Sequence, residues 1–310
     1  MSYKAKPTTP PPTTLFNEDL LRRNRLWAKP CFEPTLFKAA AKRIIARLEP
    51  LKLPFTRILD LSPFHTPGLE RWIHKTRPTS SVVRDDGYAF GEKAFDLILS
   101  PLQLHWTNDP QAYLAAIFEA LAPGGLFIAN FWGGNTLVEL RHVLAELDFE
   151  LFGTTFQRLI PLMRLEDANR LLASCPFHLG VADQDNLTFC YKNVNELCTH
   201  LKRTGEGLAL SERTLPPFSK HFWKKADTRY RHSYTYVKTL LSSKKSHKPY
   251  TKAKKLTHDP DYPIPATFSL ITLTGWKDGP DIPRALKPFS GKKDLNAVLN
   301  DSALKDLTRT

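Results

Sequence analysis

A regular alternation of short apolar segments with amphipathic ones constrains the fold of this 310-residue chain more than any other feature. The apolar segments are RILDL at 57–61, SVVR at 81–84, FDLILS at 95–100 and LFIANF at 126–131. Helical patterns separate them or follow them, at 68–75, 108–121 and 135–147. Since apolar strands that alternate with helices form parallel sheets covered on both faces, the sequence predicts an α/β fold with a mainly parallel sheet.

Two later segments complete the predicted sheet. NLTFCY at 186–191 and ATFSLITLTGW at 266–276 have strand composition but lie far apart in the chain. We therefore expect them to close the sheet at an antiparallel edge. Of the helices, 108–121 has Asp109 and 135–147 has Asn135 in the position of an N-terminal cap.

The remaining segments divide the chain into regions. Residues 1–14 are rich in Pro and Thr and predict a disordered leader, and 15–50 contain two helical patterns, 15–30 and 35–49. We expect the main domain to span 51–277 and a tail to follow at 278–310. Within the main domain, 192–259 is expected to be a helical and basic insertion. It holds an aromatic helix at about 216–241 and an exposed, mobile basic loop at 242–259.

Composition excludes some classes of protein. No apolar run approaches the roughly 18 residues that a membrane-spanning helix needs, and the first residues have no apolar core typical of a secretory signal. The four cysteines have no metal-ligand spacing, so no metal site is predicted and buried, reduced thiols are expected. These observations favour the cytoplasm of a bacterium, or the mitochondrial matrix if the source is a eukaryote.

The positive charge is concentrated in one segment. The formal net charge is +13, and 219–255 holds twelve Lys or Arg against the single acid Asp227. A concentrated charge indicates a partner surface, either an acidic protein or a nucleic acid. Aromatic residues from Phe222 to Leu241 recur at helical spacing in the same segment, as they do in helices that pack on a core and in surfaces that stack single-stranded bases.

Several segments in this order resemble one known family. These segments are FDLILSPLQLHW at 95–106, GGNTLVELR at 133–141, PLMRLEDANRLLASCPF at 161–177 and PATFSLITLTGWK at 265–277. They resemble the class I S-adenosylmethionine (SAM) methyltransferases of type 11, over about residues 15–290. Within that family the likeness is greatest to the complex I assembly-factor arginine hydroxylases, to the malonyl-carrier-protein O-methyltransferases and to α-proteobacterial relatives.

The resemblance implies a Rossmann-like sheet of seven strands with SAM at the carboxyl ends of the first strands. The family has a Gly-x-Gly-x-Gly loop after the first strand, and here Ser62, Phe64 and Thr66 stand at the three glycine positions. Glycines in such loops adopt positive φ or let the backbone approach the ligand, so their replacement predicts weak or lost SAM binding. Thr66 is expected to cap the next helix.

A second departure is one of length. Only 33 residues separate Leu61 from Phe95, whereas the two further strands and three crossovers of the family need about forty. The sequence therefore predicts a sheet that lacks one βα unit, and with that unit the acid that binds the SAM ribose. If SAM binds at all, the resemblance makes Asp60, Ser62, Asp85 and Ser100 the candidate contacts.

Individual side chains leave alternatives open. Asp60 either orients a cofactor or accepts hydrogen bonds from its own loop. His105 and Trp106 follow a strand where the family's substrate pocket begins, so His105 is either a general base or a structural histidine. Gly133 and Gly134 either form a turn before the Asn135 cap or contact a phosphate.

Two classes of function remain from the sequence. One is a family member with a degenerate cofactor loop, a pseudoenzyme that holds or acts on a protein such as a respiratory complex subunit during assembly. The other is an active SAM-dependent methyltransferase or hydroxylase of a protein or carrier-protein substrate. A nucleic-acid-binding protein is a third, less supported class.

Overall fold

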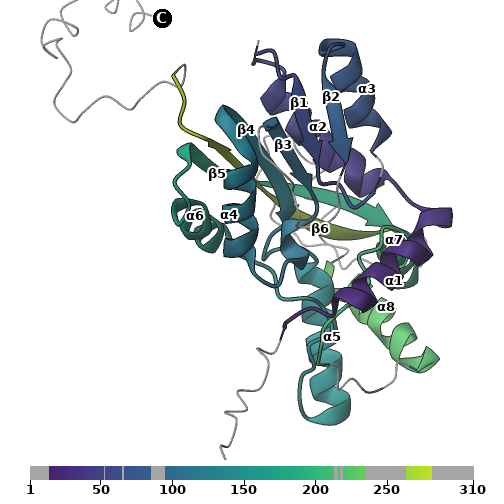
Figure 1. Ribbon diagram of the computed structural model, residues 1–310. Helices are drawn as coiled ribbons and strands as arrows, with labels where there is room; N and C mark the ends of the chain where they lie inside the picture. The colour runs from purple at the N-terminus through teal and green to yellow at the C-terminus, as the bar shows by residue number, and fades with distance from the viewer. Residues whose placement is uncertain are drawn as a thin grey trace, which may run out of the picture.

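The centre of the computed structural model is one six-stranded sheet with the strand order β2-β1-β3-β4-β6-β5 (Figure 1). The strands are β1 (Arg57–Asp60), β2 (Ser81–Arg84), β3 (Phe95–Pro101), β4 (Leu121–Trp132), β5 (His178–Tyr191) and β6 (Ile264–Trp276). The structure describes residues 14–51, 53–64, 66–84, 95–212, 216, 219–234 and 263–280. The first four strands pair in parallel and β6 pairs antiparallel with both β4 and β5. The predicted six-stranded α/β sheet with an antiparallel edge is confirmed.

Helices cover both faces of the sheet and its carboxyl edge. They are α1 (Glu18–Ala28), α2 (Thr35–Leu48), α3 (Pro67–Thr76), α4 (Pro110–Ala120), α5 (Val138–Phe152), α6 (Leu165–Ala173), α7 (Val194–Arg203) and α8 (Lys220–Tyr234), with short 3₁₀ turns η1 (Lys29–Cys31) and η2 (Leu104–Trp106). Helices α4 and α6 pack on one face and α2 and α3 on the other. Helices α1, α5, α7 and α8 lie toward the carboxyl ends of the parallel strands (Figure 1).

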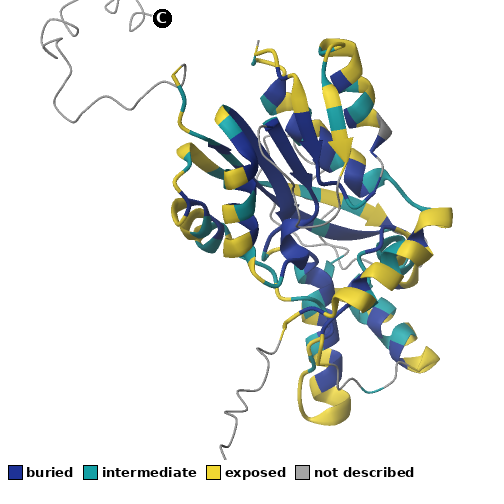
Figure 2. Ribbon diagram, viewed as in Figure 1, coloured by how far each residue is buried: buried dark blue, intermediate teal, exposed yellow. Residues whose placement is uncertain are grey.

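Strand residues alternate strictly between the two faces. Ile98 and Phe127 contact the α4–α6 layer, while their neighbours Leu97 and Leu126 contact the α2–α3 layer. All four are fully buried, as the dark central strands in Figure 2 illustrate. A strand buried on both sides needs apolar residues at every position, which is why the sequence shows continuous apolar runs here.

The beginning of α5 differs from the sequence prediction. Asn135 is exposed and does not cap the helix, which begins at Val138 after Leu137 in the left-handed region at φ 56°. The turn is held by β6 instead, because the Thr136 hydroxyl donates to the Ser269 carbonyl and accepts from the Ser269 amide. Tertiary hydrogen bonds therefore replace the local cap.

Other predictions need smaller corrections. Strand β5 begins at His178, eight residues before the predicted strand, because β6 is long enough to pair with the whole segment. The cysteines are all free, but Cys31 and Cys190 are exposed rather than buried. Within the described part of the chain, no helix combines the length and the apolar character needed to cross a bilayer.

Helix α8 confirms the inward packing of the aromatic stripe as far as it is described. Phe222, Ala226 and Tyr230 are buried, and the Tyr230 hydroxyl donates to the Pro265 carbonyl at 2.7 Å. The polar face of α8 is ion-paired, since Lys225 and Arg229 both contact Glu150 of α5. The predicted continuation to residue 241 and the basic loop at 242–259 lie outside the described residues.

A buried ion pair joins the end of α5 to the chain that follows it. Arg158 donates to both carboxylate oxygens of Asp148 at 2.6–2.8 Å, and the side chains are 2% and 0% exposed. The Phe156 amide donates to the same carboxylate at 3.3 Å. This cluster fixes the path of the loop between α5 and α6.

We expect the substitution Asp148→Asn to lower the free energy of unfolding by about 3–5 kcal/mol, because it leaves the Arg158 guanidinium buried without its counter-charge. Urea unfolding followed by circular dichroism measures the change. The matched control is Glu150→Gln, which removes the exposed partner of Lys225 and Arg229 and should change stability little. Equal losses in the two variants would contradict the expectation.

Candidate functional site

The carboxyl ends of β1, β3 and β4 form the candidate site, since loops at this edge of a doubly wound sheet bind ligands. The sheet brings the end of β1 beside the end of β3, with Asp60 in register with Leu99. Strand β4 ends beside β3, at Trp132 and Gly133. Among the described residues, no three His, Cys, Asp or Glu side chains gather as a metal site would require.

Asp60 ends β1 and bonds the loop that follows. It is 1% exposed, and its Oδ1 accepts from the Ser62 amide at 3.0 Å and from the Ser62 hydroxyl. Its Oδ2 is buried without a hydrogen bond, 3.8 Å from Arg84 Nε. Burial raises the pKa of the Asp60 carboxyl, although the hydrogen bonds from Ser62 oppose this shift. The interpretation of Asp60 as an acceptor for its own loop is therefore correct, and one oxygen remains for a further partner.

The loop at the family's glycine positions is filled with side chains. The Phe64 ring is 6% exposed and stacks on Phe32 at 4.4 Å between ring centroids, with an edge contact to Phe37 at 5.4 Å. A Cβ atom added to Gly205 would lie 2.8 Å from the Phe64 ring, so the ring also fills the space above the turn after α7. A ligand could enter this space only by displacing Phe64.

Thr66 occupies the N-cap position of α3 but does not cap it. Its hydroxyl donates to the Phe64 carbonyl at 3.2 Å and makes no capping hydrogen bond to the helix. The Ser62 hydroxyl is likewise engaged within the loop, by Asp60. The residues present thus bond to one another and do not form an open cradle for the methionine part of SAM.

The sheet order changes the interpretation of the shortened region. Strand β2 pairs directly with β1, and no described strand lies beyond β2. The position next to β1 is therefore occupied by β2. Doubly wound dinucleotide-binding sheets carry their ribose-binding acid about 20 residues after the glycine loop. Asp85 follows β2 at that distance but lies outside the described residues, so the loss of the ribose-binding acid stays a prediction.

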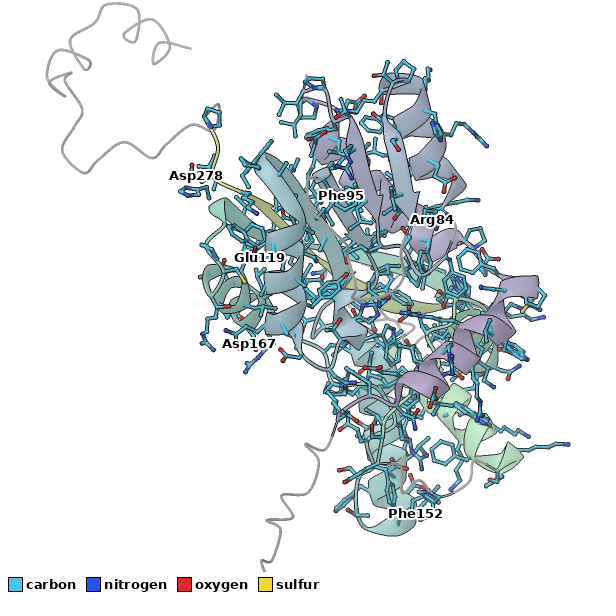
Figure 3. All side chains as sticks on the ribbon, in the orientation of Figure 1. Arg84, Phe95, Glu119, Phe152, Asp167 and Asp278 are labelled. Carbon is cyan, nitrogen blue, oxygen red and sulfur yellow. The ribbon has the colours of Figure 1, made fainter. Side chains whose placement is uncertain are left out.

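Arg84 occupies the last position of β2 and is labelled in Figure 3. Its guanidinium lies 2.7 Å from Glu70 Oε1 as well as 3.8 Å from Asp60. A cation thus faces Asp60 from the neighbouring strand.

Ser100 does not belong to the same site as Asp60. It lies on the α4 face of β3 and its hydroxyl bonds the Tyr113 hydroxyl at 2.8 Å, both groups being buried. The alternation of side chains along a strand places Ser100 and Asp60 on opposite faces of the sheet. Of the three candidate cofactor contacts that the structure describes, Asp60 and Ser62 therefore lie together and Ser100 does not.

His105 and Trp106 share one partner that sequence reasoning missed. His105 Nε2 lies 2.8 Å from Glu206 Oε2, and the Trp106 indole donates to the same oxygen at 3.0 Å. The side chains of His105 and Glu206 are 0% and 6% exposed. A carboxylate fixed by an indole and a histidine is a preorganised anionic group at the carboxyl edge.

Two glycines explain why Glu206 reaches this place. Gly205 has φ +76°, which turns the chain after α7, and Gly207 approaches Asn24 so closely that a Cβ atom would lie 3.0 Å from its amide nitrogen. Asn24 donates to the Gly207 carbonyl at 3.1 Å, which joins the segment to α1. A single acid between two glycines has no periodicity, so only its flanking glycines signal it in the sequence.

A cavity of about 670 Å³ opens beside Glu206. Helix α1 covers it with Trp27, α5 contributes Leu140 and Arg141, and α7 contributes Lys202. Trp132 at the end of β4 and Trp223 of α8 line it as well. Burial lowers the pKa of the Arg141 guanidinium, which donates to the Ile160 carbonyl at 3.3 Å. The cavity is a largely apolar and aromatic space whose charged lining residues are one acid, Glu206, and three cations, Arg141, Arg158 and Lys202.

The turn after β4 is explained by backbone pairing. The amide of Gly133 donates to the Ser269 carbonyl at 2.7 Å and that of Gly134 to the Met163 carbonyl at 2.9 Å. Both amides have protein partners, as the interpretation of a turn requires. A phosphate role for the two glycines has no support from these contacts.

Asp60 provides a test of the site by pH dependence. Since its pKa is raised, the unfolded chain loses the proton at lower pH than the folded protein, so ionisation favours unfolding. This destabilisation is absent at about pH 4 and develops as the pH rises toward neutral. We expect Asp60→Asn to gain stability relative to the unaltered protein over this range, measured as urea unfolding at a series of pH values.

Asp96 supplies a control of opposite sign. Burial alone would raise the pKa of its carboxyl, but hydrogen bonds from Thr56 and Arg57 lower it. Asp96→Asn should therefore lose stability relative to the unaltered protein as the pH rises to about 4–5, and this loss should stay constant at higher pH. If Asp60→Asn also lost stability relative to the unaltered protein as the pH rises, the raised pKa of Asp60 would be refuted.

Comparisons with known proteins agree with this architecture. A family model described as a methyltransferase domain matches residues 64–129. The human protein named mitochondrial arginine-hydroxylase NDUFAF5 is 27% identical over 296 residues, which cover 87% of this chain and 79% of the human protein. A malonyl-[acyl-carrier protein] O-methyltransferase of Xylella fastidiosa is 30% identical over 122 residues, or 39% of each chain.

Among solved structures, the YcgJ protein of Bacillus subtilis is 14% identical and covers 78% of this chain and 99% of its own, with a TM-score of 0.43. Residues 64–129 thus match the methyltransferase domain family, and most of the chain is similar in sequence to the NDUFAF5 arginine hydroxylases.

Proposed function

We propose that this chain binds a protein partner in the cavity beside Glu206 and uses SAM weakly or not at all. The observation that carries the proposal is the position of Phe64, which is packed between Phe32, Phe37 and Gly205 where its relatives have a glycine loop. The partner is a protein with a cationic side chain to insert, such as a respiratory complex subunit during assembly. We place this role in the bacterial cytoplasm, or in the mitochondrial matrix if the source is a eukaryote.

The energy of displacing Phe64 supports weak SAM binding. A fully buried phenylalanine stabilises a protein by about 1.5–3 kcal/mol relative to an exposed one. A ligand that binds at micromolar concentration has only about 8 kcal/mol of binding free energy in total. Displacing the ring would therefore remove a large share of it.

We expect calorimetric titration with SAM and with S-adenosylhomocysteine to give dissociation constants no tighter than about 100 μM. The triple substitution of Ser62, Phe64 and Thr66 by Gly should not restore binding alone, because removing Phe64 leaves the Phe32 and Phe37 rings without a packing partner. A low-micromolar constant for the unaltered protein would show that the loop opens, and would return an active enzyme to first place.

The cavity has the chemistry to receive an arginine side chain. The Glu206 carboxylate is held in place by His105 and Trp106, and three indoles, Trp27, Trp132 and Trp223, line the walls. A guanidinium pairs with carboxylates through parallel hydrogen bonds and stacks on aromatic faces. The NDUFAF5 relatives are named arginine hydroxylases, which is the same class of side chain.

This assignment can be tested with an arginine-containing peptide and its citrulline counterpart, which has the same shape and no charge. We expect the unaltered protein to prefer the arginine peptide and Glu206→Gln to weaken that binding by about tenfold. The glutamine keeps an acceptor for Trp106, so the fold should survive. Calorimetry or NMR titration measures the affinity.

The control variant is Glu146→Gln, which removes a carboxylate of an exposed side chain on α5. It should leave the affinity for both peptides unchanged. Equal binding of arginine and citrulline peptides, or a Glu206→Gln variant that binds as the unaltered protein does, would refute an arginine-binding cavity.

A second candidate function is an active SAM-dependent methyltransferase or hydroxylase of a protein or carrier-protein substrate. The buried Asp60 Oδ2 favours it, because this atom has no hydrogen bond and lies at the family's cofactor edge. A nucleic-acid-binding role has less support, since the aromatic side chains Phe222 and Tyr230 of α8 are buried. The SAM titration above separates the first two candidates.

A further inference from the structure

The free end of α5 presents the most exposed large hydrophobic side chain of the described residues. Phe149 is 67% exposed, Leu151 41% and Phe152 45%, and we call these three the tip surface. Figure 2 shows this end of α5 as exposed, and Figure 3 places Phe152 at the far end of the helix from the sheet. The tip surface is separate from the cavity, because none of its three residues lines it.

The tip surface packs on the loop that follows α5. Phe152 makes an edge contact with Phe156 at 5.5 Å between ring centroids, and the Phe156 amide is fixed by the buried Asp148 carboxylate. Arg158, bound to that same carboxylate, lies under the Phe156 and Phe222 rings at 5.4 and 4.9 Å. These contacts order the end of α5, so the exposed rings do not belong to a frayed helix end.

Positive charge lies beside the tip surface, on the neighbouring helix α8. The beginning of α8 lies beside the end of α5, where Lys225 Nζ is 3.2 Å from Glu150, and this beginning exposes Lys220, His221 and Lys224. Of the three acids in the last turns of α5, Glu146 and Glu150 pair with Arg229 and Asp148 pairs with Arg158. For the described residues at this end, the acids are compensated while Lys220 and Lys224 form no ion pair.

We propose that the tip surface inserts into the headgroup region of an anionic lipid bilayer. Exposed apolar side chains beside exposed lysines are a combination that binds such surfaces, through burial of the rings and attraction of the cations. The end of α5 projects from the body of the molecule (Figure 1), a shape that a deformable bilayer accommodates without a matching groove. The excess of positive charge in the chain, +13 overall, acts in the same direction.

Vesicle flotation tests the proposal with the full-length protein. The probes are vesicles of phosphatidylcholine with phosphatidylglycerol and vesicles of phosphatidylcholine alone. The unaltered protein should bind the anionic vesicles, and the double variant Phe149→Ser/Phe152→Ser should bind them about tenfold or more weakly. A second variant, Lys220→Gln/Lys224→Gln, should lose binding to the anionic vesicles as well, and added salt should weaken the unaltered protein.

The control is Leu26→Ser, which removes an equally exposed apolar side chain of α1, 53% exposed and outside the cavity lining. It should bind vesicles as the unaltered protein does, and all variants should keep their circular dichroism spectra. The proposal is overturned if the phenylalanine variant binds vesicles unchanged. It is equally overturned if the unaltered protein binds neither kind of vesicle, which would leave the tip surface to a protein partner. Arginine-peptide titration of the phenylalanine variant should be unaffected, so this test and the cavity test fail independently.

Discussion

The change of direction at β4 decides how the carboxyl edge is built. Strand β4 pairs in parallel with β3 on one side and antiparallel with β6 on the other. The start of β6 therefore lies at the end of β4, where Trp132 is in register with Leu270. Helices α7 and α8 precede β6 in the chain, so this pairing brings them to the edge where the parallel strands end. One wall of the cavity follows directly from this topology.

At the carboxyl end of β1, aromatic packing determines how the loop lies. Phe64 joins the loop after β1 to α2 through Phe37, to the chain before α2 through Phe32 and to the turn after α7 through Gly205. The same contacts that remove room for a ligand fasten the N-terminal helices to the domain. The buried Phe64 ring is favourable for stability and unfavourable for ligand entry. Opening the loop would therefore also disturb the packing of Phe32 and Phe37.

The predictable part of the structure is the part with periodicity. Continuous apolar runs predicted β1, β3 and β4 because these strands are buried on both faces, and the helical spacing of Leu36, Phe37 and Ile44 predicted α2. The prediction that Asn135 caps α5 was wrong because a tertiary hydrogen bond between Thr136 and Ser269 holds this turn instead. Glu206 was missed because its role depends on a backbone turn that brings it to residues about one hundred positions away in the chain. Contacts of that separation leave no local pattern.

Asp60 and Glu206 both have buried carboxylates at the carboxyl edge, and their surroundings differ. Glu206 has its carboxylate bound by an indole and an imidazole, beside a cavity large enough for a side chain. Asp60 has one oxygen engaged by its own loop and the other without a hydrogen bond, under a space that Phe64 fills. A buried acid with an unsatisfied oxygen costs stability, so its presence is more typical of a functional position than of a structural one. Phe64 therefore fills the Asp60 side of the edge, whereas a cavity adjoins the Glu206 side. Under the proposal of a partner-binding protein, this asymmetry is why we assign the partner to the Glu206 side.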